Sequence, residues 1–239
     1  MIATSPAPPL QADVHGIRYL EFKALGTHCS IKFRLPDERA ALVFAAEALG
    51  WIGKFEAKFS RFQPTSLVSR INAAAGAEWV TVDDEMEHLL KLADDLHRRT
   101  HGILDPTLLP LLRVWNWKQV HLKLPQASEV QAALALTGWQ KVQRRPGAVR
   151  LPEVGMGLDF GGFGKEYAVD YLAKIARQHG VTDALIAPGL VRVKPYERGN
   201  LSKPVMAGSL DPLQMAMTEH AYFSGEGSYG GGGGGDGCG

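Results

Sequence analysis

The sequence lacks a charge excess, is poor in cysteine and has no long apolar run. Lysine and arginine number 26 against 25 aspartates and glutamates, so the formal net charge is +1. This balance favours neither a nucleic-acid partner nor a strongly acidic, unfolded chain. The two cysteines, Cys29 and Cys238, lie far apart, and we expect two free thiols. No window approaches the run of about 18 apolar residues that crosses a bilayer, so we expect no membrane span.

The two ends of the chain also lack the patterns of folded or targeting segments. Residues 1–16 have no basic start followed by an apolar run, so no secretory signal is expected, and we predict a flexible leader in a cytoplasmic protein. From residue 194 no periodicity is sustained, and glycine dominates residues 225–239. Such a composition buries too little apolar surface to offset the entropy of ordering. We therefore predict a divergent, disordered tail over 194–239.

The residues between these ends, 17–193, carry periodic patterns of both kinds. Apolar side chains at helical spacing, with polar caps, predict helices near 37–58, 84–100, 128–137 and 165–179. Ser128 and Gln131 are read as the capping box of the third helix. Alternating or compact apolar runs predict strands at 17–25, 28–35, 142–151, 156–160 and 183–186. The sequence therefore predicts one α+β domain.

A glycine-rich turn between the predicted strand at 156–160 and the predicted helix at 165–179 is the most informative segment. Residues 158–170 read LDFGGFGKEYAVD, which predicts a strand, a glycine turn and a helix start. Free N–H groups at a helix N-terminus attract anions, and Lys165 adds a positive charge there. An ordinary strand-to-helix turn with an exposed lysine explains the same residues equally well. The lysine is not followed by serine or threonine, which excludes a Walker A loop.

Four segments together resemble the FAD:protein FMN transferase (ApbE) family. Residues 158–170 are similar to the family's Asp-hydrophobic-Gly-Gly-x-Ala/Gly-Lys signature. Residues 25–27 resemble its Met-Gly-Thr, and residues 60–72, SRFQPTSLVSRIN, resemble its aromatic-bearing Ser and Asn loop. Residues 102–107, GILDPT, resemble its Gly-x-Phe-Asp-Pro-Thr. The four segments occur in the family's order over about residues 20–193, which makes the resemblance specific.

The resemblance implies an ApbE-like, T-fold-like domain and a transferase. Enzymes of this family bind FAD, use Mg²⁺, and move the FMN part to a threonine hydroxyl of an acceptor protein, with release of AMP. The chemistry is consistent with this use of metal, because phosphoryl transfer needs a cation on the pyrophosphate and an acceptor placed in line. The family resemblance also leaves a periplasmic location open.

The site residues are carried over from the family's motifs position by position. The resemblance implies that Leu25 touches the flavin, that Phe62 packs on the isoalloxazine ring, and that the Gly162 carbonyl binds the metal. The remaining FAD contacts that it implies are Ile103, Leu104 and Asp105 along the nucleotide portion, with Asp159 and Lys165 holding FAD by hydrogen bonds and charge. Each residue also has an ordinary structural explanation: core packing for the apolar ones, a turn for Asp105 and a cap for Asp159.

Three departures from the family pattern concern its C-terminal part. In residues 184–193, Ala187 stands in place of the family's asparagine, and its Gly-Gly-Asp is reduced to Gly189-Leu190. The family's His-x-hydrophobic-Asp-Pro-x-Thr-Gly segment and its C-terminal Ala-Asp-x-x-x-Thr motif, which supplies side-chain metal ligands, have no counterpart. We therefore expect a domain that is incomplete at its C-terminus, truncated or degenerate, with doubtful activity. The alternative is a non-catalytic flavin-binding remnant or a non-functional fragment.

A zinc site is the other metal hypothesis that the sequence raises. His97 and His101 are four residues apart, a spacing that places two ligands on one face of a helix. No cysteine or carboxylate completes a ligand set beside them, and Gly102 is expected to end that helix. We therefore do not predict zinc binding.

Overall fold

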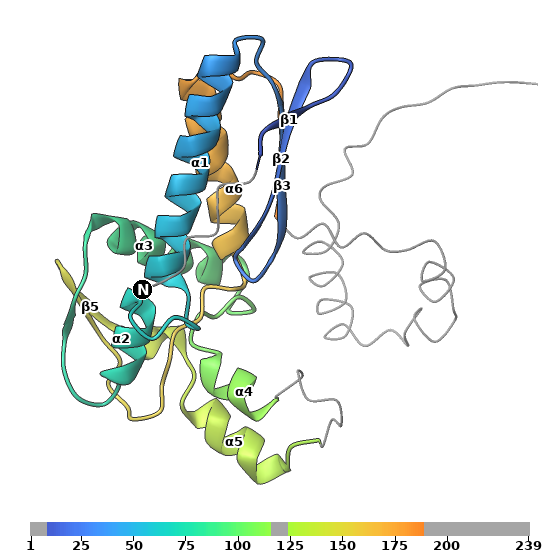
Figure 1. Ribbon diagram of the computed structural model, residues 1–239. Coiled ribbons are helices and arrows are strands. Elements are labelled where there is room, and N and C mark those ends of the chain that lie inside the picture. Colours follow the sequence, from blue (N-terminus) through green and yellow to red (C-terminus); the bar gives the residue numbers. More distant parts are fainter. Residues whose placement is uncertain (1–8, 116–123, 189–239) are drawn as a thin grey trace, which may run out of the picture. The chain divides into compact units, whose positions relative to one another are not determined.

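A computed structural model describes residues 9–115 and 124–188 (Figure 1). They form two compact units, one within residues 1–49 and 169–239 and the other within residues 50–168. The boundaries fall inside two helices, α1 (Glu38–Phe59) and α6 (Gly164–Gln178), so both helices contribute to both units. Helices combined with two antiparallel sheets confirm the predicted α+β class.

The first unit contains a four-stranded antiparallel sheet in the order β1-β2-β3-β7. Its strands are β1 (Gln11–Ala12), β2 (Ile17–Ala24), β3 (Thr27–Arg34) and β7 (Ala184–Pro188). One face of the sheet is covered by α1 and α6 (Figure 1). Ile31 and Phe33 of β3 are buried on this face, and the Phe33 ring packs edge-on against Phe44 of α1 at 4.8 Å between centroids. Alternation along β3 therefore anchors the sheet to the helices.

A two-residue turn joins β2 to β3. Ala24 pairs with Thr27, which leaves Leu25 and Gly26 as the turn residues, with φ angles of 54° and 72°. Two positive φ angles are typical of the type I′ turn, whose twist matches that of a hairpin. Glycine adopts this conformation readily, whereas leucine does so at a cost. Leu25, a predicted flavin contact, is therefore held in a disfavoured backbone conformation.

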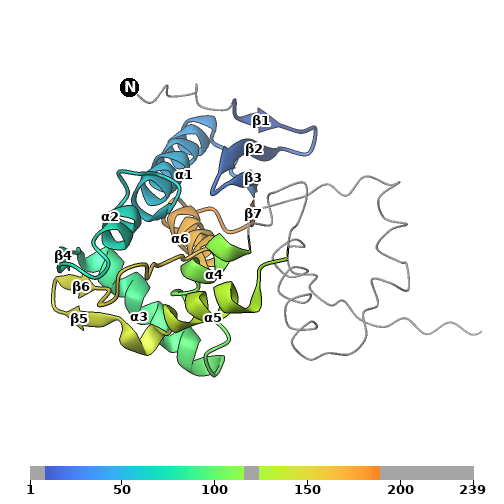
Figure 2. The same cartoon turned by 90° about the horizontal axis from the view of Figure 1, so that it is seen from below.

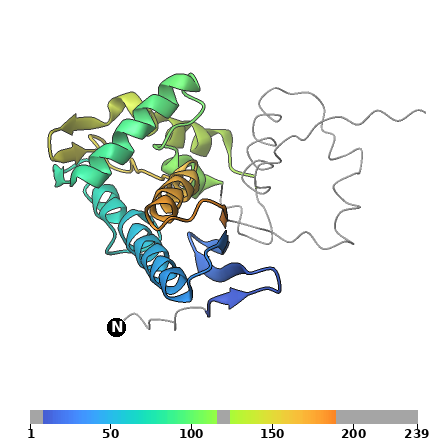
Figure 3. The same cartoon turned by 90° about the horizontal axis from the view of Figure 1, so that it is seen from above.

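The second unit combines short helices with a three-stranded antiparallel sheet in the order β4-β6-β5. Its elements are α2 (Leu67–Ala73), β4 (Val80–Thr81), α3 (Asp84–Arg99), α4 (Leu109–Val114), α5 (Ala127–Ala135), a 3-10 turn (Trp139–Lys141), β5 (Gln143–Arg145) and β6 (Ala148–Arg150). Helix α3 lies beside β5 and β6 (Figures 2 and 3), and Asp94 of α3 pairs with Arg144 of β5. Met86 and Leu89 of α3 are fully buried, as the predicted apolar stripe requires.

The four predicted helices are confirmed, with ends that agree within two residues. The capping box of α5 is displaced from its predicted position, because the Glu129 carboxylate accepts the backbone N–H of Gln126 at 2.7 Å. The predicted strands at 17–25, 28–35 and 183–186 are confirmed, and that at 142–151 is resolved into β5 and β6. Helix α4 and strand β4 were not predicted, and β1 lies within the segment predicted to be a flexible leader.

The predicted strand at 156–160 is wrong. This segment has no ladder partner, and its backbone groups bond to a side chain and to a loop instead, as described below. Gly157 also approaches α4 so closely that a Cβ there would lie 2.7 Å from a Leu109 methyl carbon. The prediction for residues 194–239 and that for the Cys238 thiol lie outside the described residues; Cys29 is buried in β3.

Candidate functional site

The loop before α2 is fixed by the hydroxyl groups of its own motif. Ser66 caps α2 by accepting the Ser69 N–H at 2.9 Å, and Ser69 in turn donates its hydroxyl to the carbonyl of Arg61 at 3.3 Å. The Ser60 hydroxyl accepts the N–H of Phe62 at 3.3 Å. The side chain of Phe62 is nonetheless 66% exposed, although phenylalanine is usually buried. The motif therefore presents an aromatic ring to solvent from a constrained backbone.

Asn72 connects this loop and helix to the glycine-rich segment. Its amide nitrogen donates to the carbonyl of Leu158 at 3.0 Å, and its amide oxygen accepts the N–H of the same residue at 2.6 Å. Leu158 is fully buried, so these two bonds satisfy backbone groups that water does not reach. One side chain thus takes the place of a strand partner and fixes the position of the next residue, Asp159.

Asp159 is the point at which three of the four motif segments meet. Its carboxylate accepts the Arg61 Nε–H at 2.6 Å and the N–H of Gly161 at 2.7 Å. Its own backbone N–H donates to the carbonyl of Pro106 at 2.8 Å. The carboxylate and Arg61 are mostly buried, with 17% and 23% of their side chains exposed. Segments 60–72, 102–107 and 158–165 are therefore neighbours in the second unit.

Asp105 is engaged within the protein. Its carboxylate accepts both the N–H and the hydroxyl of Thr107, at 2.7 and 2.6 Å, and the N–H of Trp139 at 3.1 Å. The Thr107 hydroxyl also accepts the N–H of Gly138 at 2.7 Å, and Thr107 is fully buried. The carboxylate thus ties its turn to the 3-10 turn, which is the structural role that the sequence left open.

The two apolar residues before Asp105 differ in their surroundings. Ile103 is 69% exposed, whereas Leu104 is half-buried and lies near the glycine turn, with its Cγ 4.0 Å from an ideal Cβ position on Gly162. The backbone of Leu104 is fixed at both ends, by the Thr100 hydroxyl and by Nδ1 of His97. His97 therefore positions this loop, and its partner is a carbonyl.

Gly162 and Lys165 lie where the glycine turn enters α6. Gly162 is exposed, and Lys165 is a half-buried residue of the first helical turn. Within residues 9–115 and 124–188, no cluster of three or more His, Cys, Asp or Glu side chains is placed to hold a metal. Since Mg²⁺ prefers several hard oxygen ligands, carboxylates among them, the described residues do not make a magnesium site on their own.

Leu25, the remaining predicted residue, belongs to the first unit. It occupies the β2–β3 turn with a positive φ and a half-buried side chain. Backbone strain of this kind is found at ligand contacts, where surrounding structure imposes it. The turn is thus compatible with the predicted flavin contact, which stays a prediction.

Two cationic side chains, Arg61 and Lys58, make contacts that the sequence does not indicate. Besides its bond to Asp159, Arg61 has its guanidinium carbon 4.1 Å from the centroid of the Phe62 ring. Lys58 of α1 pairs with Asp83 and Glu85 at 2.6 Å each. The acidic residues at the start of α3 indicate that a cation could pair with them. The sequence does not indicate that this cation is Lys58, which lies 25 residues before Asp83.

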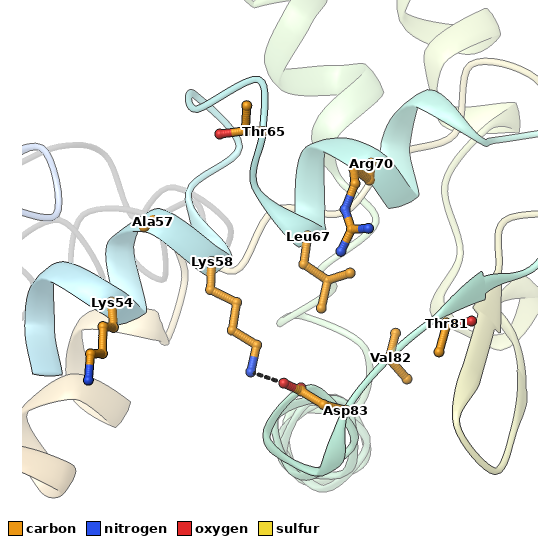
Figure 4. Close-up of a pocket in the computed structure, with 9 residues that line it drawn as sticks. All are labelled: Lys54, Ala57, Lys58, Thr65, Leu67, Arg70, Thr81, Val82 and Asp83. Carbon is orange, nitrogen blue, oxygen red and sulfur yellow. Dashed lines mark hydrogen bonds and ion pairs between the residues drawn. The ribbon is translucent and has the colours of Figure 1, made fainter. Parts of the chain in front are cut away.

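Lys58 also borders an open cavity of about 600 Å³, across which it reaches Asp83 (Figure 4). The cavity is lined by Lys54, Ala57, Lys58, Thr65, Leu67, Arg70, Thr81, Val82 and Asp83. None of the predicted site residues is among these side chains. The cavity therefore borders segment 60–72, through Thr65, Leu67 and Arg70, but none of the predicted FAD or metal contacts lines it.

No helix among the described residues has both the length and the apolar character needed to cross a membrane.

Comparison with known proteins assigns most of the chain to one family. The model of the ApbE family matches residues 25–198, and a domain of unknown function, DUF4266, matches residues 193–239. The second match covers the segment predicted to be a divergent, disordered tail.

Named relatives and solved structures agree with the first match. A FAD:protein FMN transferase of Klebsiella pneumoniae is 27% identical over 195 residues, which cover 78% of this chain and 54% of that protein. The structure of the Pseudomonas stutzeri flavinyl transferase ApbE in its apo form superposes with a TM-score of 0.64 at 26% identity, covering 71% of this chain and 56% of that one. The ApbE protein of Thermotoga maritima gives a TM-score of 0.65 at 29% identity, covering 73% and 57%. The chain thus spans little more than half the length of these relatives. On its motifs, its fold and the family match to residues 25–198, the chain belongs to the ApbE family.

Proposed function

We propose that this chain binds FAD and serves the transfer of FMN from FAD to a threonine hydroxyl of an acceptor protein. The observation that carries the proposal is the convergence at Asp159, whose carboxylate and backbone N–H bond to two other motif segments. Arg61 and Asp159 are separated by 98 positions in sequence and are in direct contact, which is expected when distant motifs build one binding site. Membership of a family whose named relatives are FAD:protein FMN transferases supplies the substrate.

The proposed contacts follow the geometry of the second unit. The exposed Phe62 ring packs on the isoalloxazine, and Ile103, Leu104 and the turn at Asp105 line the nucleotide portion. Because the Asp105 carboxylate is already bonded to Thr107 and Trp139, its backbone is the better candidate for contact with ligand. Asp159 and Lys165 hold FAD through hydrogen bonds and charge. Leu25 is proposed as a further flavin contact on the resemblance of residues 25–27 to the family's motif.

In the proposed reaction, the threonine oxygen attacks the phosphorus of the FMN half. A new P–O bond forms to the threonine, the bond to the bridging oxygen breaks, and AMP leaves with that oxygen. The hydroxyl proton is released. When bound, Mg²⁺ would neutralise the charge that builds on the pyrophosphate. The Gly162 carbonyl is the one ligand for it that we propose in this chain, and it does not replace anionic ligands.

The proposal is tested in two steps. Binding of FAD to the full chain is measured first, by the change in flavin fluorescence on titration. The chain is then incubated with FAD, Mg²⁺ and a threonine-bearing acceptor protein, and a fluorescent flavin band is sought in a denaturing gel. Binding with a flavin band supports the transferase, and binding without a band supports the non-catalytic alternative. Absence of FAD binding at millimolar concentrations would overturn the proposal.

A further inference from the structure

Arg61 contacts two of the proposed flavin-binding side chains at once. Its Nε–H donates to the Asp159 carboxylate at 2.6 Å, while its guanidinium carbon lies 4.1 Å from the centroid of the Phe62 ring. Its own carbonyl is fixed by the hydroxyl of Ser69 at 3.3 Å. The backbone and the head group of Arg61 are therefore both anchored, and the side chain links Phe62 of one motif to Asp159 of another.

We propose that Arg61 is a positioning residue for the flavin half of FAD. A guanidinium over a ring face fixes the ring by attraction to its π electrons. The Phe62 side chain stays 66% exposed and is therefore accessible to a planar ligand. The same guanidinium holds the Asp159 carboxylate at a set position beside the glycine turn, through a charge-assisted bond in a mostly buried setting. Arg61 thus prepares the aromatic and the anionic contact together.

The contact between Arg61 and Phe62 is better suited to binding than to stabilising the fold. Phe62 is 66% exposed, so holding its ring in place buries little apolar surface. An exposed aromatic side chain normally samples several rotamers, and a ligand that stacks on it must first overcome that freedom. Fixing the ring in advance lowers this cost. Residue preorganisation of this kind raises the affinity for the flavin ring and leaves the nucleotide half unaffected.

This inference rests on the proposed function, and the experiment separates the two. Arg61→Met and Arg61→Lys variants of the full chain are titrated with FAD, FMN and ADP, with ADP followed by its competition with FAD. Arg98→Met is the matched control, because Arg98 also forms a 2.6 Å ion pair, with Asp95, but on an exposed surface. Thermal unfolding of each variant is recorded in the same buffer.

We expect Arg61→Met to weaken FAD and FMN binding by about tenfold while ADP binding changes less than about twofold. Arg61→Lys should recover part of the loss, since an ammonium keeps the ion pair but lacks the planar face. Wild-type chain that binds no FAD would overturn the proposed function and this inference with it. Normal FAD binding by Arg61→Met, or equal losses for all three ligands with a lowered melting temperature, would overturn the inference alone.

Discussion

At the scale of single residues, Asn72 shows how a polar side chain replaces a strand partner. Its amide bonds to both backbone groups of the fully buried Leu158. Without the amide, the N–H and the carbonyl of Leu158 would lose their partners in a place that water does not reach. The position of Asp159 then loses its main support. Asn72 therefore links α2 to the glycine-rich segment through both backbone groups of one buried residue.

Asn72→Ala is expected to lower the free energy of unfolding by about 3 kcal/mol, because two buried backbone groups are left without partners. Denaturant titration of the variant and the wild type measures the difference. Gln131→Ala is the control, since Gln131 is exposed on α5 and should change stability by less than about 0.5 kcal/mol. Equal stability of Asn72→Ala and the wild type would show that these bonds are not made in solution.

At the scale of elements, the β2–β3 turn offers a test of function against strain. Leu25 has a φ of 54°, which glycine adopts without the steric cost that a Cβ brings. Leu25→Gly should therefore keep or raise stability by up to about 1 kcal/mol, while it weakens FAD binding by removing an apolar contact. Thermal unfolding and FAD titration are measured on the same sample. Unchanged FAD affinity would remove Leu25 from the site.

A second element-scale test concerns the ion pairs that tie α1 to the start of α3. Burial disfavours the charged form of Asp83, but the Lys58 ammonium and the N–H of Met86 outweigh it and lower the pKa of the carboxyl below its ordinary 3.8. A depressed carboxyl pKa gives stability that is present above about pH 4 and is lost as the pH falls through the folded pKa. For Lys58, burial opposes the charge, yet Asp83 and Glu85 raise its pKa above 10.5. That contribution is present below about pH 10 and is lost as the pH rises through the folded pKa.

We therefore expect Lys58→Met to be less stable than the wild type near pH 7 and to lose less additional stability between pH 5 and pH 2, roughly the window of carboxyl titration. Urea unfolding at several pH values measures both quantities. Lys174→Met provides the control, because Lys174 has no carboxylate partner among the ion pairs of the described residues. Parallel pH profiles for Lys58→Met and the wild type would mean that the Asp83 contact adds nothing to stability.

The elements that sequence patterns predict well are those with caps and long apolar periods. Helix α3 has a polar cap, Asp83, and its apolar side chains Met86 and Leu89 are buried. The missed elements, α4 and β4, have six and two residues, too few for a period to be visible. The segment 156–160 looks like a strand because its alternating side chains are buried, yet its backbone bonds go to Asn72 and Pro106. Such long-range side-chain partners leave no local signal.

The sequence predicted which segments form the candidate site. It did not predict which side chains of these segments contact one another. The motifs located Phe62, Asp105 and Asp159, and the structure brings their segments together in one unit. The Asp105 carboxylate accepts hydrogen bonds from Thr107, two residues away, and from Trp139, which lies more than 30 residues later in the chain. The second bond could not be predicted from the local sequence. The role of Arg61 likewise depends on a partner far along the chain, which one sequence does not indicate.

At the scale of the whole molecule, two family matches meet within residues 193–198. The ApbE match ends at 198 and the DUF4266 match begins at 193. All four motif segments lie before this junction. The alignment with the Klebsiella pneumoniae relative covers 54% of that protein. The C-terminal motif that the family resemblance implies, with side-chain metal ligands, has no counterpart in the sequence. The sequence thus contains all the proposed FAD contacts but only one proposed metal ligand, the Gly162 carbonyl.

This inequality predicts that the chain alone transfers FMN far more slowly than a full-length relative while it still binds FAD. Breaking the pyrophosphate builds negative charge, and a firmly held Mg²⁺ stabilises that charge by several kcal/mol, which corresponds to a rate factor of about 10³ or more. The described residues offer the Gly162 carbonyl and no carboxylate cluster, so this stabilisation should be weak.

Initial rates of flavin-band formation are compared with those of the Klebsiella pneumoniae relative, with and without EDTA, at FAD concentrations that saturate both proteins. Binding without turnover is expected, because affinity for the substrate does not by itself lower the barrier. An EDTA-sensitive rate equal to that of the relative would contradict the prediction and would show that residues outside the described ranges supply the missing ligands.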